Sequence, residues 1–507
     1  MPCQATKHPV LFEINTRAWL RDVSEASGTT ATLADVPEAE LDRFSSLGID
    51  LVWLMGVWKV GEKAAEKARA QPGLEAEYRR ALPDLRPEDI TGSPYAVGDY
   101  TVAESLGGAG SLHLFRKRLE GRGIGLVLDF VTNHVGLDHA WIRKRPELFV
   151  QGDEGDLERE GGNYFRVDTV SGPRILAHGR DPYFPAWTDT AQLNFSRRET
   201  RAAMKGTLQA LGGLCDGVRC DMAMLALDSV FRRVWGERAL RTAGDPPASG
   251  EFWSEAIHDA RANRPSFVFL AEAYWGLERE LQILGFDYTY DKTLYDLLVR
   301  RDPAGIRSHL AAPLEIQARA ARFVENHDEP RAAAVFPPER LRASTLIAAT
   351  LPGMVLFHEG QLEGRKVRLP IQLQRRPPEP VDPPARAFHA RLLEALKDEA
   401  FREGSWRLLE VRPAWEGNPT WRDFIAHEWT SPRGARMLVA ANLGATRGQC
   451  TVGFGRAEWL GGEVELVDLL GDARYLRDGR ELAQRGLYLD MPEAGCHLFQ
   501  VSARPRR

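Results

Sequence analysis

Eight short apolar runs, separated by longer segments with helical periodicity, constrain this chain more than any other feature. Amphipathic segments such as residues 112–123 and 252–264 lie between several of the runs. This alternation predicts an α/β fold built from βαβ units. Eight strands over about 350 residues match a (β/α)8 TIM barrel better than an open doubly wound sheet, because no G-x-G-x-x-G follows an early strand. The runs are LFEIN (11–15), LVWL (51–54), GLVLDF (125–130), GVRCD (217–221), FVFLAE (267–272), FDYTY (286–290), FVENHD (323–328) and MVLFHE (354–359).

Two regions depart from the alternation and predict further domains. The segment after the third run is too long for an ordinary βα loop and contains the acidic, glycine-rich stretch 151–165. Beyond residue 400 the pattern changes to short alternating segments separated by turn residues, which is typical of antiparallel strands. We therefore expect a barrel formed by residues 1–133 and 196–400, an inserted subdomain at 134–195, and a C-terminal antiparallel β-sandwich at 401–507.

Composition restricts the partners and the compartment. The chain has 507 residues, 43% hydrophobic and 27% charged, with a net charge of -5, which is typical of a soluble protein and does not favour a nucleic-acid partner. The N-terminus lacks the apolar stretch of a signal peptide or membrane helix, so we expect a cytoplasmic protein without a membrane partner. The oligomeric state is not predicted. Five cysteines without a C-x-x-C pair indicate reduced thiols in a reducing compartment: Cys3, Cys215, Cys220, Cys450 and Cys496.

Ionisable residues close four of the runs, at the positions where a (β/α)8 barrel builds its active site. Such residues often cap the next helix or pair with a loop, but four on one rim favour a functional site. The carboxylates Asp221, Glu272 and Asp328 are expected to converge there. The candidates are Asp129 with Asn133 and His134 after the third run, Arg219 and Asp221 in the fourth, Glu272 in the fifth, and Asn326, His327 and Asp328 in the seventh.

Converging carboxylates, without the histidine and cysteine spacing of a zinc site, suit glycoside cleavage. One carboxylate must be ionised to attack the anomeric carbon, and another must carry a proton for the leaving oxygen. Strand alternation places Arg219 and Asp221 on one face, so we expect Arg219 to lower the pKa of Asp221. Glu272 ends an apolar run, and partial desolvation is expected to favour its protonated form.

Four segments resemble, in order, the signature regions of the α-amylase family of retaining α-glucan enzymes. They are DFVTNH (129–134), GVRCD (217–221), FLAEAYWG (269–276) with its Glu272, and ENHD (325–328). In addition, SPYAVGDY (93–100) resembles the family's substrate-facing tyrosine segment, and AQLNF (191–195) the short signature near the end of its inserted domain. The resemblance extends over essentially the whole chain and implies the same barrel, insertion and C-terminal β domain.

The resemblance also implies roles for single residues. Asp221 would be the nucleophile, Glu272 the general acid and base, and Asp328 the carboxylate that holds sugar hydroxyls. Trp275 and Trp187 are candidates for stacking on further sugars, with core packing as the alternative. The expected substrate-binding set is Arg219 to orient the nucleophile, His134 and His327 to bond the sugar, Tyr95 to stack on it, and Asp129, Asn326 and Trp275 around it.

Two departures from the family pattern bear on substrate and metal. Many α-amylases carry a Lys-His pair shortly after the nucleophile, whereas this chain has Met224 and Leu225, which puts action on long starch in doubt. No cofactor is required. Calcium remains an alternative, with Asn133 as its candidate ligand, although calcium takes six to eight oxygens. The acidic Asp153 and Asp156 equally fit a solvated loop.

These features predict a retaining hydrolase of α-1,4-linked glucans or malto-oligosaccharides that works through a covalent glycosyl-aspartate. A 4-α-glucanotransferase or another transglycosylase is the alternative, because it uses the same carboxylates. A phosphorylase-like or maltosyl-transferring activity is a third alternative, although nothing in the chain clearly marks a phosphate site. A non-catalytic scaffold is disfavoured because all three carboxylates are present.

Overall fold

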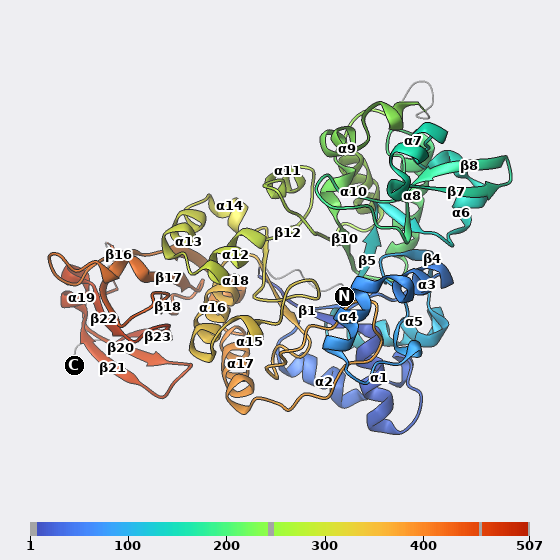
Figure 1. Ribbon diagram of the computed structural model, residues 1–507. Coiled ribbons are helices and arrows are strands. Elements are labelled where there is room, and N and C mark those ends of the chain that lie inside the picture. Colours follow the sequence, from blue (N-terminus) through green and yellow to red (C-terminus); the bar gives the residue numbers. More distant parts are fainter. Residues whose placement is uncertain (1–7, 242–247, 456–458, 505–507) are drawn as a thin grey trace.

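Eight parallel strands close into a barrel in the order β1-β14-β13-β12-β11-β10-β5-β2, which confirms the predicted fold (Figure 1). The computed structural model describes residues 8–241, 248–455 and 459–504. Six of the barrel strands are buried along their whole length, as expected for parallel strands covered on both faces. The strands are β1 (Val10–Asn15), β2 (Leu51–Met55), β5 (Gly125–Val131), β10 (Gly217–Asp221), β11 (Val268–Ala271), β12 (Tyr288–Tyr290), β13 (Ala320–Arg322) and β14 (Met354–His358).

The seventh predicted strand, residues 323–328, is wrong in position. The strand is β13, and it ends at Arg322, so the ENHD segment forms the loop that follows it. The Asn326 side chain explains the difference. Its Oδ1 accepts hydrogen bonds from the backbone N–H groups of Asp328 and Glu329, both at 2.9 Å, and these donors are then not available to a strand ladder.

Helices surround the barrel, and the predicted helical segments at 112–123 and 252–264 correspond to α5 and α10. In α5 the buried side chains of Leu112, Phe115 and Leu119 follow one face. The barrel helices are α1 (Thr16–Ser27), α2 (Glu38–Ser46), α5 (Gly108–Glu120), α8 (Arg198–Gly212), α9 (Asp228–Leu240), α10 (Phe252–Asn263), α11 (Glu278–Ile283), α12 (Lys292–Arg300), α13 (Pro303–Leu310), α14 (Leu314–Gln317), α15 (Ala332–Val335), α16 (Pro338–Thr350) and α17 (Pro383–Ala395).

Two excursions leave the barrel at the carboxyl ends of its strands. The one after β2 pairs β3 with β4 and carries two helices, and the one after β5 pairs β6 with β9 and β7 with β8. The first excursion contains β3 (Trp58–Val60), α3 (Glu62–Ala70), α4 (Pro72–Ala81) and β4 (Val97–Val102). The second contains β6 (His134–Gly136), α6 (Ala140–Lys144), α7 (Glu154–Arg159), β7 (Tyr164–Thr169), β8 (Gly172–Ala177) and β9 (Thr190–Gln192).

The C-terminal region is a sandwich of two antiparallel sheets, ordered β15-β17-β18-β23-β20-β21 and β16-β19-β22. It lies at the opposite end of the barrel from β7 and β8 (Figure 1). Its elements are α18 (Glu399–Glu403), β15 (Ser405–Leu408), β16 (Glu410–Pro413), β17 (Phe424–Thr430), β18 (Arg436–Asn442), β19 (Gly448–Gly453), β20 (Glu463–Asp468), β21 (Arg474–Asp478), α19 (Gly479–Arg485), β22 (Leu487–Met491) and β23 (Cys496–Arg504).

The six-stranded sheet divides its side chains between two apolar cores. Along β18, Leu438 and Ala440 pack toward the smaller sheet, whereas Met437, Val439 and Ala441 belong to the core that continues into the barrel. This alternation is the two-residue period of a strand covered on both faces. The barrel and the larger sheet therefore share one continuous apolar core.

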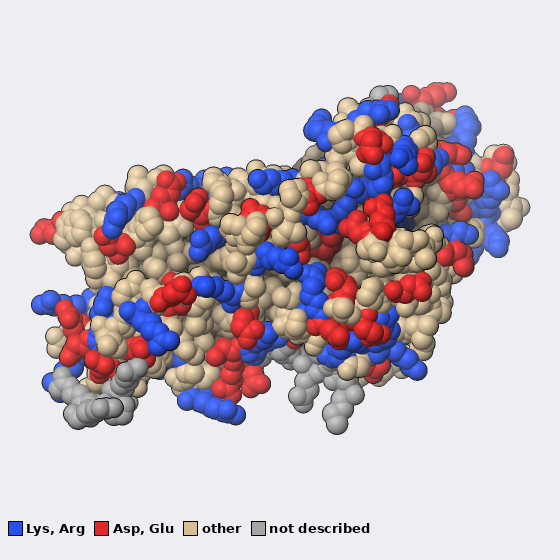
Figure 2. Space-filling view, turned by 90° about the horizontal axis from the view of Figure 1, so that it is seen from below, with Lys and Arg blue, Asp and Glu red and all other residues tan. Residues whose placement is uncertain are grey.

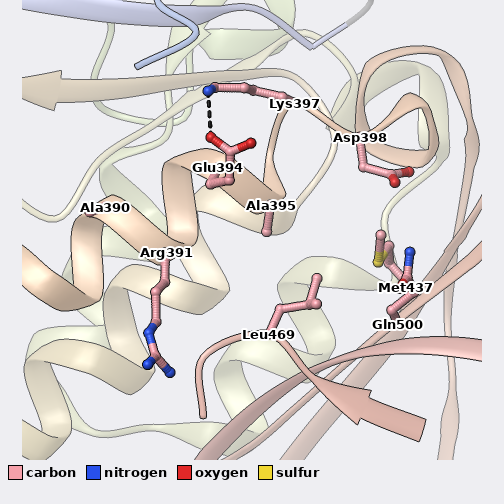
Figure 3. Close-up of a pocket in the computed structure, with 9 residues that line it drawn as sticks. All are labelled: Ala390, Arg391, Glu394, Ala395, Lys397, Asp398, Met437, Leu469 and Gln500. Carbon is pink, nitrogen blue, oxygen red and sulfur yellow. Dashed lines mark hydrogen bonds and ion pairs between the residues drawn. The ribbon is translucent and has the colours of Figure 1, made fainter. Parts of the chain in front are cut away.

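An open pocket of about 630 Å³ lies where α17 and the residues after it meet the C-terminal sandwich (Figure 3). Ala390 and Ala395 of the helix face Met437 and Leu469 of the sandwich, and Lys397 pairs with Glu394 beside them. None of the strand-end carboxylates lines this pocket.

Basic and acidic side chains are interspersed over the face shown in Figure 2. No helix among the described residues is both long and apolar enough to cross a membrane. The four described cysteines, Cys215, Cys220, Cys450 and Cys496, are free thiols, and Cys3 lies outside the described residues.

Candidate active site

Arg219 lies at the centre of the charged cluster at the carboxyl ends of the strands. Its side chain is fully buried, with Nη1 2.6 Å from Oδ1 of Asp221 and Nη2 2.7 Å from Oε2 of Glu272. Asp129 on the neighbouring strand β5 lies directly across from it in register, and its Oδ1 is 3.9 Å from Nη1. One guanidinium thus contacts carboxylates from three adjacent strands, which confirms that the predicted Arg219 and Asp221 share one environment.

Aromatic rings enclose this guanidinium. Its central carbon lies 5.2 Å from the ring centre of Trp53, 5.1 Å from that of Tyr95 and 5.8 Å from that of Tyr290. Ring faces carry partial negative charge and stabilise a cation that has lost its water. The cluster is therefore built to keep Arg219 charged in a dry site.

The pKa of Asp221 is raised above its usual range because the carboxyl group is buried, and the neighbouring Asp129 and Asp328 add to this effect. Arg219 acts in the opposite direction, by charge and by hydrogen bonding, but does not outweigh burial. The sequence-based expectation of a lowered pKa is therefore wrong. It counted the arginine and omitted the desolvation of the carboxylate.

Burial also raises the pKa of Glu272, to about 7, even though Arg219 opposes the shift. This confirms the predicted direction. Oε2 of Glu272 accepts a hydrogen bond from the backbone N–H of Met222, and Oε1 accepts one from the hydroxyl of Tyr274, both at 2.8 Å. Sequence reasoning missed Tyr274. Its place two residues after Glu272, matching the spacing of Arg219 and Asp221, was the available signal.

His327 links the third carboxylate to the barrel. Its Nε2 is 3.1 Å from Oδ2 of Asp328 and 2.8 Å from the hydroxyl of Tyr95, while its Nδ1 contacts Oε1 of Glu13 in β1. Burial alone would lower the pKa of His327, but Asp328 and Glu13 raise it well above its usual value. Glu13, in the middle of the first apolar run, was not predicted. An acidic residue inside a buried strand was its signal.

Asp328 stands at the mouth of the site, with its side chain 40% exposed. Burial would raise its pKa, yet the charge and hydrogen bond of His327, together with Arg219, hold it at about 2. This carboxylate is therefore ionised at neutral pH.

Asp129 and Asn326, both buried, use their side-chain oxygens within the protein. Asp129 accepts hydrogen bonds from Nε1 of Trp53 at 3.2 Å and from the backbone N–H of Gly56 at 2.9 Å, and burial raises its pKa to about 6. Asn326 binds the backbone of its own loop through Oδ1. These contacts shape the rim of the site.

Asn133 and His134 lie at the base of the inserted segment. Oδ1 of Asn133 accepts a hydrogen bond from Nε2 of Gln192 at 2.9 Å, and its Nδ2 donates to Oε1 of Gln192 at 3.1 Å. Burial lowers the pKa of His134 to about 4, so the ring is neutral, and it packs against Trp187 with ring centres 5.1 Å apart. Trp187 therefore contacts the site through the ring of His134.

The acidic residues of the insertion organise a helix. Asp153 caps α7 by accepting from the backbone N–H of Asp156 at 2.9 Å, and the buried Asp156 pairs with Arg159 at the same distance. No group of three or more His, Cys, Asp or Glu side chains is placed to hold a metal ion in the part of the chain that the structure describes. The Asn133 oxygen is bonded within the protein, and no acidic side chain among the described residues joins it in such a group.

Two exposed aromatic side chains, Trp275 and Tyr183, form a platform in which Trp275 follows Glu272 by three residues, and the exposed Phe184 is next to Tyr183 in the chain. Trp275 is 37% exposed and meets Tyr183 edge to face at 5.0 Å. Its φ of 66° is a left-handed conformation that bulky residues rarely adopt. Oδ1 of Asp181 fixes the other two by accepting from their backbone N–H groups, and Arg233 donates to the Tyr183 hydroxyl at 2.9 Å. Met224 and Leu225, by contrast, are buried core residues.

No family model matches the chain. It is 24% identical over 368 residues to an α-amylase, MalA, of Haloarcula japonica, an alignment that covers 71% of this chain and 44% of the relative. It is 24% identical over 350 residues to an α-1,4-glucan:maltose-1-phosphate maltosyltransferase of Burkholderia pseudomallei, in an alignment that covers 67% of this chain and 26% of the relative. It is 25% identical over 295 residues to a trehalose-6-phosphate hydrolase of Escherichia coli, in an alignment that covers 51% of this chain and 53% of the relative. The chain thus matches about half or less of the length of these curated relatives.

Solved structures share the fold over almost the entire chain. A maltogenic α-amylase, AmyB, from Thermotoga neapolitana gives a TM-score of 0.68 at 18% identity and covers 97% of this chain and 99% of its own. An α-amylase from Geobacillus thermoleovorans in complex with acarbose gives a TM-score of 0.65 at 17% identity, and the match covers 99% of this chain and 100% of that chain. Its sequence relatives, its barrel with a C-terminal sandwich, and the strand-end cluster of Asp221, Glu272 and Asp328 all support the α-amylase family for this chain.

Proposed function

We propose that the protein is a retaining glycoside hydrolase that cleaves α-1,4-linked glucans or malto-oligosaccharides. The observation that carries the proposal is the pairing of Asp221 and Glu272 with the two terminal nitrogens of one buried guanidinium, that of Arg219. This pairing places the two carboxyl groups close together. Retaining enzymes hold theirs about 5 Å apart, and inverting enzymes about 6.5–9.5 Å.

The two carboxyl groups divide the chemistry between them. Glu272, with a pKa of about 7, is protonated in about half of the molecules at neutral pH, and the protonated form gives its proton to the glycosidic oxygen as that bond breaks. An oxygen of Asp221 bonds to the anomeric carbon and forms the glycosyl-aspartate. Glu272, now ionised, takes a proton from water, whose oxygen replaces Asp221 at the anomeric carbon and releases the sugar.

Other members of the cluster bind the sugar. Asp328 is ionised and open to the mouth, so it accepts hydrogen bonds from hydroxyl groups, and the N–H groups of the protonated His327 supply positive charge behind it. The exposed platform of Trp275 and Tyr183 offers aromatic faces to sugars beyond the cleavage point. An α-glucan substrate is supported by the names of the sequence relatives. A reducing compartment is supported by the free described cysteines.

A 4-α-glucanotransferase is the second candidate. The aromatic platform favours it, because its Trp275 follows Glu272 by three residues and could hold an acceptor sugar in place of water; two of the curated relatives are maltosyltransferases. Hydrolysis and transfer share every step up to the glycosyl-aspartate and differ only in what resolves it.

A time course with purified protein and maltoheptaose, in which each product is resolved by chain length, tests both candidates. Only shorter products are expected from a hydrolase. Products longer than maltoheptaose would identify a transferase. No turnover of maltoheptaose, with or without added inorganic phosphate, would contradict both proposals.

A further inference from the structure

The imidazole ring of His327 is held by side chains from two strands and two loops. Glu13 contacts Nδ1, whereas Oδ2 of Asp328 at 3.1 Å and the Tyr95 hydroxyl at 2.8 Å share Nε2. Trp53 of β2, which lies across from Glu13 in register, meets the ring edge to face at 5.4 Å. The ring is 3% exposed and has one orientation that meets all these partners.

The contacts also determine how many protons the ring carries. A neutral imidazole has one N–H group and can donate at only one nitrogen. Here each ring nitrogen faces a carboxylate oxygen, and a carboxylate can only accept. The Tyr95 hydroxyl can accept as well as donate, so a ring with hydrogen on both nitrogens satisfies every partner, and the two facing carboxylates favour this imidazolium form.

Glu13 is the less expected of the two carboxylates. It is fully buried, and its Oε2 has no hydrogen-bond partner in the described part of the chain. A buried carboxylate is costly unless it is paired with a charge, and the Glu13 side chain pairs with the ring of His327. Its place in β1 therefore depends on a positive charge on the ring.

We infer that Glu13 is a positioning residue that keeps His327 doubly protonated, so that its Nε2–H group is always directed at Asp328 and at the sugar that Asp328 binds. This inference rests on the proposed glycosidase function. Without Glu13, the ring could lose its Nδ1 proton, or could turn its single N–H group away from Asp328. Either change would leave Asp328 without its cationic partner.

The variant Glu13→Gln tests this role, because it keeps the size and an acceptor oxygen but removes the charge. Asp328, Asp129, Tyr95 and Arg219 also act on this ring and its carboxylate, and all four remain in the variant. With maltoheptaose, we expect kcat/KM within about threefold of the unaltered protein at pH 6 and at least about 30-fold lower at pH 8.5. At high pH, kcat/KM of the variant should fall about 100-fold per pH unit instead of tenfold, because both Glu272 and His327 then lose a proton.

Two further variants separate charge from structure. Glu13→Asp keeps the charge and should restore the pH profile of the unaltered protein, in which kcat/KM depends on the loss of one proton, that of Glu272. Glu428→Gln removes a buried, arginine-paired carboxylate in the C-terminal sandwich and should leave the profile unchanged. A Glu13→Gln profile that is lowered equally at every pH would overturn the inference, because that is the result of a merely structural role.

Nuclear magnetic resonance of protein labelled with 15N in the histidine rings gives a readout that needs no substrate. The His327 signals are assigned by their loss in His327→Gln. In the unaltered protein both ring nitrogens should stay protonated to pH 9, and in Glu13→Gln one should lose its proton below that pH. If both nitrogens stay protonated in the variant, the inference fails, even if glycosidase activity is demonstrated. If the enzyme turns over no α-glucan, the ring signals still decide the role of Glu13.

Discussion

At the scale of residues, the strand-end cluster holds more acidic groups than cations. Arg219 and His327 face Asp129, Asp221, Glu272, Asp328 and Glu13. Burial disfavours so many neighbouring negative charges, and the raised pKa values of Asp221 and Glu272 are the result. In the proposed mechanism, Glu272 is the proton donor because burial raises its pKa to about 7, and Asp221 is the attacking group.

Replacing the attacking oxygen should stop the reaction without unfolding the protein. Asp221→Asn keeps the shape of the side chain but cannot form the glycosyl intermediate, so turnover of maltoheptaose should fall about 1,000-fold or more. Thermal unfolding of the variant should remain cooperative and close to that of the unaltered protein. Retained turnover at a tenth of the original rate would contradict the assignment. If neither protein turned over the substrate and the variant bound it as well as the unaltered protein, the result would point to a scaffold.

The proton on Glu272 predicts a basic limb in the pH profile. The group is active when protonated, and its pKa is about 7, so kcat/KM should fall tenfold per pH unit above that value. Glu272→Gln should lose this limb together with about 100-fold or more of the activity. An unchanged profile with full activity on unactivated glucans would show that another group supplies the proton.

Tyr274 should adjust where that limb lies. Its hydroxyl donates to Oε1 of Glu272, and a hydrogen bond of this kind favours the ionised carboxylate. Tyr274→Phe removes the bond, so the pKa of Glu272 should rise and the basic limb of kcat/KM should move to higher pH, by about one unit or less. A shift toward lower pH would mean that Tyr274 instead favours the protonated acid.

The sequence predicted the residues that contact one another along strands, and failed where several strands act together. Arg219 and Asp221 were predicted as neighbours because alternation alone decides their common face. Glu13 contacts His327 across 314 positions of sequence, a distance that no local pattern encodes. The pKa of Asp221 was mispredicted for the same reason, since its burial is a property of the closed barrel.

At the scale of elements, the loops after the strands determine the shape of the site. Strand identity was predicted well, because long apolar runs with Gly and Pro punctuation leave few alternatives. The end of β13 was not, because the short side chain of Asn326 binds its own backbone and turns an apolar stretch into a loop. The excursion with α3 and α4 after β2 was not predicted, because no apolar pattern in that segment marks it as a separate unit.

The loop after β11 stores strain at Trp275. A left-handed conformation costs a non-glycine residue about 1–2 kcal/mol, and glycine avoids that cost. In Trp275→Gly this relief offsets the lost contact with Tyr183, worth about 0.5–1.5 kcal/mol, so the free energy of unfolding should change by less than about 1 kcal/mol. KM for maltoheptaose should nevertheless rise roughly threefold to tenfold, because a stacking surface of that worth is lost.

A second exposed tryptophan offers a control for this prediction. Trp415 lies in the C-terminal sandwich, away from the strand ends, and is 54% exposed. Trp415→Gly should leave KM unchanged. An unchanged KM in Trp275→Gly as well would remove the platform from the substrate site.

At the scale of the whole molecule, the C-terminal sandwich is joined to the barrel through a buried polar contact. Nε2 of His427 in β17 lies 3.0 Å from the Thr350 hydroxyl and 3.1 Å from the Thr350 carbonyl oxygen at the end of α16, and Nε1 of Trp429 donates to the same carbonyl. Burial lowers the pKa of His427 to about 3, so the ring stays neutral in the folded protein.

This histidine should make the protein less stable in acid. An unfolded chain binds a proton at this ring below pH of about 6.5, and the folded chain does not until about pH 3, so its contribution to stability is lost as the pH falls through that window. His427→Gln should be less stable than the unaltered protein at pH 7, by about 1 kcal/mol, and this deficit should shrink at pH 5. Urea unfolding at both pH values measures it, with the exposed His113→Gln as the control. A constant deficit would contradict the linkage.

The shared core of the barrel and the six-stranded sheet has a consequence for how this protein can be recombined. Met437, Val439 and Ala441 of β18 face the barrel, and they are interleaved residue by residue with side chains that face the smaller sheet. A sandwich taken from another enzyme would have to match both surfaces at once, in the same strand and the same register. The C-terminal region is therefore not an interchangeable module, and truncation after α17 should leave an aggregating barrel instead of a smaller enzyme.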